Sequence, residues 1–184
     1  MNTKSSLTYL AVTLISIALG YTLGIARARS QFSPALPSKE KLEEARTYGL
    51  PLNNPDAVSP AKAFHMRDED PVYGVVYRGH ARAYPRWLMI SYHIANDTID
   101  GSPLMLAQCE VCSSVSAFVP ETPVLNNIPL VFTACGFHGG TFEMCDDYTH
   151  SRWQPFAGKA FRGPLKGVRL LNRIPVVIQT WNVS

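Results

Sequence analysis

The apolar positions of this chain follow three different patterns along its 184 residues. Residues 7–26 form an uncharged, largely apolar run. Residues 30–62 are polar and interrupted by prolines, whereas residues 63–184 alternate short apolar segments with turn-forming residues. The patterns predict a transmembrane anchor with its flanks over residues 1–29, a Pro-rich linker over residues 30–62 and one folded domain over residues 63–184.

The apolar run is long enough to cross a bilayer as a helix and too long for the apolar part of a signal peptide. Lys4 precedes it, and Arg27 and Arg29 follow it. Because the charges on the two sides are nearly balanced, they do not indicate which end of the helix lies in the cytoplasm. A short tail before one folded domain favours export of that domain. We therefore expect a single-pass protein of the cell inner membrane, with the lipid bilayer as a partner and a periplasmic soluble domain.

Small residues recur every four positions within this run, at Ser16, Gly20 and Gly24. This spacing places them on one helical face, where a neighbouring helix can approach closely. Glycine is also common in transmembrane helices that have no partner. We favour packing of this helix against other membrane-protein subunits.

The linker contains one predicted helix, over residues 39–48. Ser38 is a typical N-cap, and Gly49 a typical end signal. Alternating lysine and glutamate residues indicate a solvent-facing spacer.

The remaining pattern predicts a mainly β domain (α+β with minor helix), a single compact domain behind one N-terminal transmembrane helix. About 115 residues of this kind can bury a sufficient core without cross-links. Residues 78–80 are expected to turn between two strands, residues 87–95 to form a short helix, and residues 96–101 to form a turn. Strands are expected at residues 72–77, 81–84, 104–108, 114–119, 128–134, 141–145, 168–171 and 176–180.

Charge excludes one class of partner. The formal net charge is +3, and Lys4, Arg27 and Arg29 account for it. The soluble part is therefore neutral, which argues against nucleic-acid binding. A basic stripe after the last acidic residue suits anionic lipid heads or an acidic partner, or is an ordinary solvated surface. Its members are Arg152, Lys159, Arg162, Lys166, Arg169 and Arg173.

The densest chemistry lies in a C-x-x-C at Cys109 and Cys112 and a C-x-x-H at Cys135 and His138, with Cys145 seven residues further on. Three thiolates with a fourth ligand, His138 or Cys145, suit tetrahedral zinc, and copper is the alternative cofactor. In an oxidising compartment, four cysteines commonly form two disulfides, with three possible pairings. Thiol-redox chemistry is a third alternative.

The residues around the C-x-x-C argue against a thioredoxin-like site and against haem attachment. Thioredoxin-like activation needs a C-x-x-C at a helix N-terminus, whereas strands are expected on both sides of Cys109 and Cys112. Ser113 follows the pair where c-type haem attachment needs histidine.

Asp146 and Asp147 are expected to cap a turn, and His93 to be a hydrogen-bonded core residue. The sequence contains no P-loop, dinucleotide fingerprint, G-x-S-x-G or H-E-x-x-H motif.

A series of short motifs resembles the DUF3179 family, a bacterial and archaeal domain named for its lack of assigned function. The resemblance covers roughly residues 56–181 and implies one domain, often exported or membrane-tethered, without implying a reaction. Many relatives carry histidine followed by glutamate or histidine where this chain has Tyr92-His93, so a site built from both residues would be incomplete here. The motifs are Asp70-Pro71-Val72-x-Gly74-Val75, Ala81-Arg82-Ala83-Tyr84-Pro85, Ala95-Asn96-Asp97-Thr98, Cys109-Glu110-Val111-Cys112-Ser113-Ser114, Gly140-Thr141-Phe142-Glu143-Met144-Cys145-Asp146, Ser151-x-Trp153 and Gly158-x-Ala160-x-x-Gly163-Pro164-Leu165-x-Gly167.

Two function classes follow from these observations. We favour a non-enzymatic accessory subunit of a larger membrane complex, with respiratory or photosynthetic electron-transfer assemblies as natural hosts. The alternative is a free-standing, membrane-tethered protein that binds metal or performs thiol-redox chemistry through the Cys/His cluster.

Overall fold

The computed structural model describes residues 37–59 and 62–181. The predicted anchor, with Ser16, Gly20 and Gly24, lies outside these residues. Among the residues that the structure describes, no helix has the length and apolar character needed to cross a bilayer.

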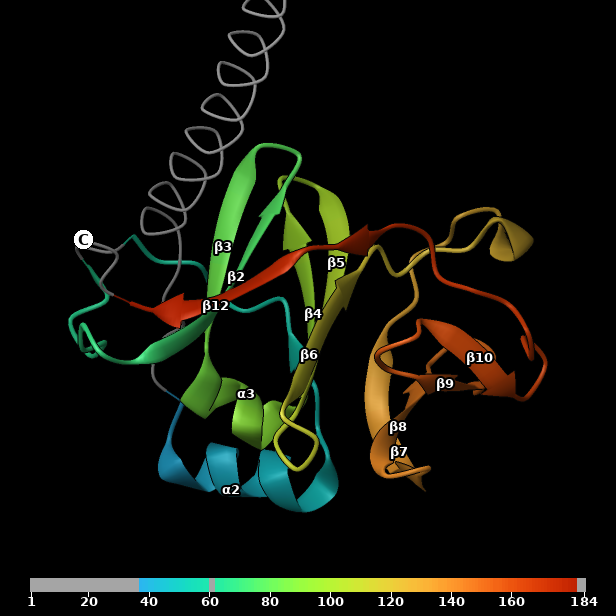
Figure 1. The fold of residues 1–184 in the computed structure, drawn as a ribbon, viewed down its shortest axis with the longest axis horizontal. Coiled ribbons are helices and arrows are strands. Elements are labelled where there is room, and N and C mark those ends of the chain that lie inside the picture. The colour runs from blue at the N-terminus through green and yellow to red at the C-terminus, as the bar shows by residue number, and fades with distance from the viewer. Residues whose placement is uncertain (1–36, 60–61, 182–184) are drawn as a thin grey trace, which may run out of the picture.

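Three β-sheets form the domain and lie side by side in Figure 1. The central sheet has the order β1-β4-β5-β6-β11, with β1 Leu52–Asn53, β4 Ile94–Ile99, β5 Ser102–Cys109, β6 Ser114–Phe118 and β11 Arg173–Ile174. A second sheet has the order β12-β2-β3, with β12 Val176–Thr180, β2 Pro71–Tyr77 and β3 His80–Pro85. The third has the order β10-β9-β8-β7, with β10 Lys159–Arg162, β9 Arg152–Gln154, β8 Thr141–Asp146 and β7 Phe132–His138. The prediction of a mainly β, compact domain is confirmed.

Strand β5 organises the core because both of its faces are buried. Met105, Ala107 and Cys109 belong to one apolar cluster, which also contains residues of the third sheet. Leu104 and Leu106 belong to a second cluster, shared with the β12-β2-β3 sheet. Alternate side chains of a strand point to opposite faces, so β5 is the shared middle layer of both cores. This alternation points Cys109 toward the third sheet.

Two helices lie together beside the sheets, α2 (Lys39–Tyr48) and α3 (Arg86–Tyr92) (Figure 1). Ser38 caps α2 by accepting a hydrogen bond from the Lys41 N–H, as predicted. The helix buries Ala45 completely, and its C-cap Gly49 lies close to Ala134 of β7. The predicted spacer helix therefore packs on the domain through one face. A short 3-10 helix, η2, spans Pro123–Leu125.

Residues 96–101 were predicted to form a turn, and this prediction is wrong for most of the segment. They continue strand β4 as far as Ile99, and only Asp100 and Gly101 form the turn. The Asn96 amide donates to the Phe132 carbonyl at 2.9 Å and accepts from the Phe132 N–H at 3.0 Å. The Asn96 side chain thus bonds to the Phe132 backbone as a neighbouring strand would. These bonds satisfy its polar atoms inside the sheet.

Two other predicted strands differ from the structure. The segment predicted at residues 128–134 becomes β7, Phe132–His138, so the strand begins later and reaches the C-x-x-H. Residues 168–171 form one isolated bridge, between Arg169 and Lys159. Their backbone instead bonds to Ala160 of β10 and to the loop residues Gly158, Leu165 and Glu121, contacts that sequence periodicity does not reveal.

Candidate redox site

The four cysteines form two disulfides, Cys109–Cys112 and Cys135–Cys145. His138 does not join them, because its ring stacks on Phe161 with 5.0 Å between centroids. Within residues 37–59 and 62–181, no group of three or more His, Cys, Asp or Glu side chains is placed to hold a metal ion. Zinc or copper binding by Cys109, Cys112, Cys135, His138 and Cys145 needs thiolates, so it stays a prediction for the reduced protein.

The Cys109–Cys112 bond closes the tight connection between β5 and β6. Cys109 is the last residue of β5 and pairs with Ser114, the first residue of β6. Ser113 adopts a positive φ of 45°, and its N–H donates to the Glu110 carbonyl at 3.1 Å. The turn replaces the helix of thioredoxin-like sites, in agreement with the strands predicted on both sides.

The two sulfurs of this bond differ in exposure. Cys109 is only 4% exposed and lies in the apolar cluster, whereas Cys112 is half-buried at its edge. The Cys112 N–H lies 3.3 Å from the Cys109 sulfur and donates to it. The Thr141 hydroxyl lies 3.5 Å from the Cys112 sulfur. Each sulfur therefore has one hydrogen-bonding group, and solvent reaches mainly Cys112.

Two apolar side chains near this site face solvent. Val111, between the two cysteines, is 83% exposed. Phe137, which pairs with Phe142 in the β7–β8 hairpin, is 63% exposed. The hairpin also contributes Thr141, so Val111 and Phe137 lie on the two segments that meet at Cys112. An accessible sulfur where two segments with exposed apolar side chains meet is suited to contact another polypeptide.

A polar network lies behind the turn. Gln108 points away from Cys109 along β5, and its amide donates to the Glu110 carboxylate at 2.9 Å. Arg86, the first residue of α3, forms an ion pair with Glu110, and this contact raises the pKa of Arg86. Burial raises the pKa of Tyr73, against the opposing effects of Gln108 and Arg86. This network fixes the base of the C-x-x-C turn through side chains of β2, α3 and β5.

His93 lies between α3 and β4 and is the C-cap residue of α3. Its backbone has a positive φ of 60°, which is strained for a residue other than glycine. Its carbonyl accepts from the Gln108 N–H at 2.7 Å, and its ring lies 5.9 Å from that of Phe142. Burial lowers its pKa, and its Nδ1 is buried without a hydrogen-bond partner among the described residues. The predicted packing of the His93 ring in the core is therefore confirmed. The predicted hydrogen bonding is wrong for its Nδ1.

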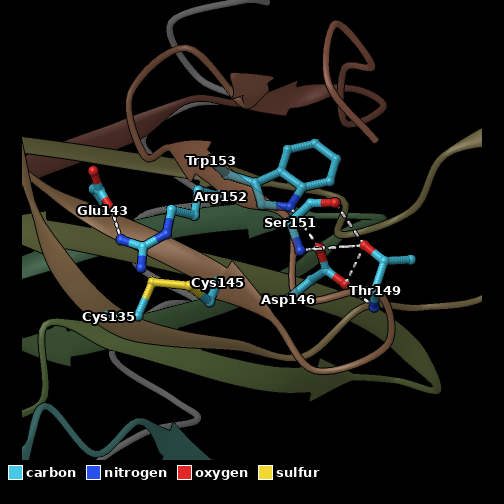
Figure 2. The surroundings of a disulfide bond; sticks show 8 residues. All are labelled: Cys135, Glu143, Cys145, Asp146, Thr149, Ser151, Arg152 and Trp153. Atoms are coloured by element: carbon cyan, nitrogen blue, oxygen red, sulfur yellow. Dashed lines mark hydrogen bonds and ion pairs between the residues drawn. A yellow bond between two sulfur atoms is a disulfide. The ribbon is translucent and has the colours of Figure 1, made fainter. Parts of the chain in front are cut away.

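The second disulfide, Cys135–Cys145, joins the paired strands β7 and β8 on the opposite face of the third sheet from its apolar core. Figure 2 shows the Arg152 guanidinium between this disulfide and Glu143, with which it forms an ion pair. Gly136 makes room for the pair, because an added Cβ would lie 3.0 Å from the Glu143 carboxylate. The charges of this pair therefore lie beside the disulfide, in contrast to the apolar surroundings of Cys109.

Asp146 supports the same strand end from the core side, as Figure 2 shows. Its carboxylate accepts hydrogen bonds from the Thr149 hydroxyl at 2.9 Å, the Ser151 N–H at 3.1 Å and the Trp153 indole at 2.8 Å. The predicted capped turn is confirmed for Asp146. The exposed Asp147 accepts from the Val131 N–H.

A buried charged network between β3 and β4 was not anticipated as a unit. Tyr84 donates to Asp97 at 2.7 Å, and the Arg82 guanidinium lies 3.4 Å from the same carboxylate. Burial is the main reason that the pKa of Tyr84 rises well above 10.0 and that the pKa of Asp97 rises from 3.8. The only signal in the sequence is the alternation of Ala81 and Ala83 with Arg82 and Tyr84, which places both polar groups on one face.

Comparison with protein families finds a match over most of the domain. The model described as "Protein of unknown function (DUF3179)" matches residues 49–183. No curated protein and no solved structure matches the chain.

Proposed function

Because the chain belongs to the DUF3179 family, for which no reaction is assigned, we propose a function from the site itself: thiol–disulfide exchange at Cys109–Cys112. The observation that carries the proposal is the asymmetry of this bond. A half-buried, partly accessible Cys112 is joined to a buried Cys109 whose sulfur already accepts a backbone N–H. In such a pair a partner thiolate can reach one sulfur, and a backbone N–H stabilises the thiolate that the other sulfur forms on leaving.

The exchange follows from these positions. A partner thiolate attacks the Cys112 sulfur, a mixed disulfide forms, and the Cys109–Cys112 bond breaks. Cys109 leaves as a thiolate and is stabilised by the Cys112 N–H at 3.3 Å. A second partner thiol, deprotonated for attack, then displaces Cys112, so two electrons pass from the partner to the protein. The partner becomes a disulfide, its two protons are released, and Cys109 and Cys112 end as thiols once they take up protons.

The compartment is part of this proposal. The two disulfides are compatible with an oxidising environment outside the cytoplasm. With the predicted anchor at residues 7–26, the domain would stand on the periplasmic side of the inner membrane as a single-pass protein. There it would meet exported proteins whose cysteines are being oxidised or reduced.

A redox titration tests the proposal on the full chain. The protein is equilibrated in glutathione buffers from about −180 to about −300 mV, free thiols are alkylated, and the labelled cysteines are identified by mass spectrometry. We expect Cys109 and Cys112 to titrate together within this range while Cys135 and Cys145 remain oxidised. If Cys109–Cys112 stays oxidised throughout, or is reduced only when the domain unfolds, the bond is structural and the proposal fails.

The second candidate function is the non-enzymatic accessory subunit of a larger membrane complex. The exposed Val111 and Phe137 favour it, since both lie on segments that meet at Cys112 and exposed apolar surface is typical of contact sites. Gentle solubilisation of the native membrane should then release the protein within a large assembly. Gly20→Leu with Gly24→Leu should weaken this association if the small-residue face packs against another helix. Migration as a monomer-sized species would reject the candidate.

A further inference from the structure

We infer that a hollow between β6 and the segment of residues 169–173 binds a small anionic amphiphile, a carboxylate or phosphate head on an apolar body. The hollow is open to solvent and has a volume of about 560 Å³, which lies in the range of small-molecule sites. Its floor is apolar: Phe118 and Leu170 are buried, and Phe156 is half-buried. Arg169 and Arg173 stand at its rim.

The two arginines are free to receive an anion. No ion pair among the described residues involves Arg169 or Arg173, and no carboxylate lines the hollow. Arg173 is held over the Phe118 ring, 5.9 Å from its centroid, and Arg169 donates to the Ala157 carbonyl at 3.3 Å. A guanidinium presents several donors, so both groups keep N–H bonds available for a carboxylate or phosphate.

The walls of the hollow are fixed before any ligand arrives. The Leu170 N–H donates to the Gly158 carbonyl at 2.8 Å, and the Leu171 N–H donates to the Glu121 carbonyl at 2.9 Å. Arg173 pairs with Phe118 in the β11–β6 ladder. Gly158 has a φ of +56°, and a Cβ there would lie 2.7 Å from the Phe118 ring. The rim charges therefore project from a segment anchored on both sides, which lowers the ordering cost of binding.

A single amphiphile fits this geometry better than a flat bilayer surface does. Lipid heads need only exposed cations, whereas here two cations border an apolar recess. The other basic residues of the stripe do not line the hollow. The apolar floor takes the body of the ligand, and the rim pairs with its head.

The test uses the full chain in nanodiscs of zwitterionic lipid and the soluble probe 4-(4-fluorophenyl)butyrate, followed by fluorine NMR. We expect saturable binding that empty nanodiscs lack, and binding at least about tenfold weaker in Arg169→Gln with Arg173→Gln. Ala157→Trp, which fills the hollow without changing charge, should weaken binding similarly. Arg162→Gln, an exposed member of the basic stripe outside the hollow, should leave it within about twofold.

Three outcomes overturn the inference. Binding that does not saturate, or that equals binding to empty nanodiscs, shows that there is no site. Equal losses in Arg162→Gln and in the rim variants show general electrostatic attraction. Displacement of the probe by phosphatidylglycerol placed in the nanodisc shows that the occupant is a bilayer lipid and rejects a small, soluble amphiphile. Thermal unfolding of each variant establishes that a lost signal does not come from lost folding.

Discussion

The two disulfides of this domain lie within 40 residues of sequence and have opposite surroundings. Cys109–Cys112 spans a sequence separation of 3 at a turn, with Cys109 inside an apolar core. Cys135–Cys145 spans a separation of 10 across two paired strands, beside the Arg152–Glu143 ion pair. The first bond links residues that the turn already holds together, while the second ties two strands of the outer sheet to each other.

This difference indicates which of the two disulfides contributes more to the stability of the fold. A cross-link stabilises mainly by restricting the unfolded chain, and a longer loop gives more restriction. The Cys135–Cys145 region is also supported by the buried carboxylate of Asp146. The Cys109–Cys112 bond adds less to stability, which is consistent with a bond that opens and closes. Four changes test this contrast.

The largest effect is expected from Asp146→Ala. The change leaves the Trp153 indole, the Ser151 N–H and the Thr149 hydroxyl without their shared acceptor inside the protein. We expect a loss of at least about 3 kcal/mol in the free energy of unfolding. Urea unfolding followed by tryptophan fluorescence measures it. Asp147→Ala, at the exposed neighbouring carboxylate, is the matched control and should cost less than about 1 kcal/mol.

Removing each disulfide separately sharpens the contrast directly. Loop entropy predicts a loss of about 3 kcal/mol for Cys135→Ser with Cys145→Ser, and about 2 kcal/mol for Cys109→Ser with Cys112→Ser. Calorimetric unfolding of both double variants under non-reducing conditions gives the comparison. If the Cys109–Cys112 variant is the less stable of the two, the turn depends on its cross-link and the assigned roles are reversed.

A smaller change is expected when the hydroxyl at Cys112 is removed. Thr141 lies 3.5 Å from the Cys112 sulfur, and a hydroxyl donor there favours the thiolate after reduction. Thr141→Val should therefore raise the pKa of the Cys112 thiol and slow its alkylation by about two- to fivefold near neutral pH. Thr141→Ser should restore the rate. The ultraviolet absorbance of the thiolate, read against pH, provides the titration. An unchanged rate in Thr141→Val would remove this residue from the site.

The smallest expected effect is a pH dependence from His93, whose carbonyl accepts from the N–H of Gln108, the residue before Cys109. Burial lowers its pKa below the ordinary 6.5, so the folded state favours the neutral ring. The stability that this group contributes is present above pH 6.5 and is lost as pH falls through the lowered pKa. His93→Asn should flatten the decline in unfolding free energy between about pH 7.5 and pH 5, because asparagine tolerates positive φ and does not titrate.

His150→Asn is the control for that experiment. His150 also has a positive φ, 56°, and is exposed. Its replacement tests whether asparagine at a positive-φ position changes the pH profile of stability by itself. An equal flattening in both variants would show that the effect belongs to the backbone conformation or to general charge, and not to the buried ring.

Prediction from sequence succeeded where a signal is local. Ser38 and Gly49 marked the ends of α2, Gly79 marked the β2–β3 turn, and the strands on both sides of the C-x-x-C were placed correctly. It failed at Asn96, since the partner that makes a strand possible there is the backbone of Phe132, 36 residues away. The same reason hid the pairing of Arg82 and Tyr84 with Asp97.

The sequence by itself determined that this domain is mainly β, that residues 31–184 carry no formal net charge and that a C-x-x-C joins two strands, because periodicity, turn residues and spacing are local properties of the chain. Only the tertiary structure decided which cysteines pair, that Cys109 is buried while Cys112 is accessible, and that Thr141 stands beside that sulfur. It also decided that Arg169 and Arg173 border an apolar hollow. These relations depend on how three sheets close around β5, and contacts between distant segments leave no periodic signal in a single sequence.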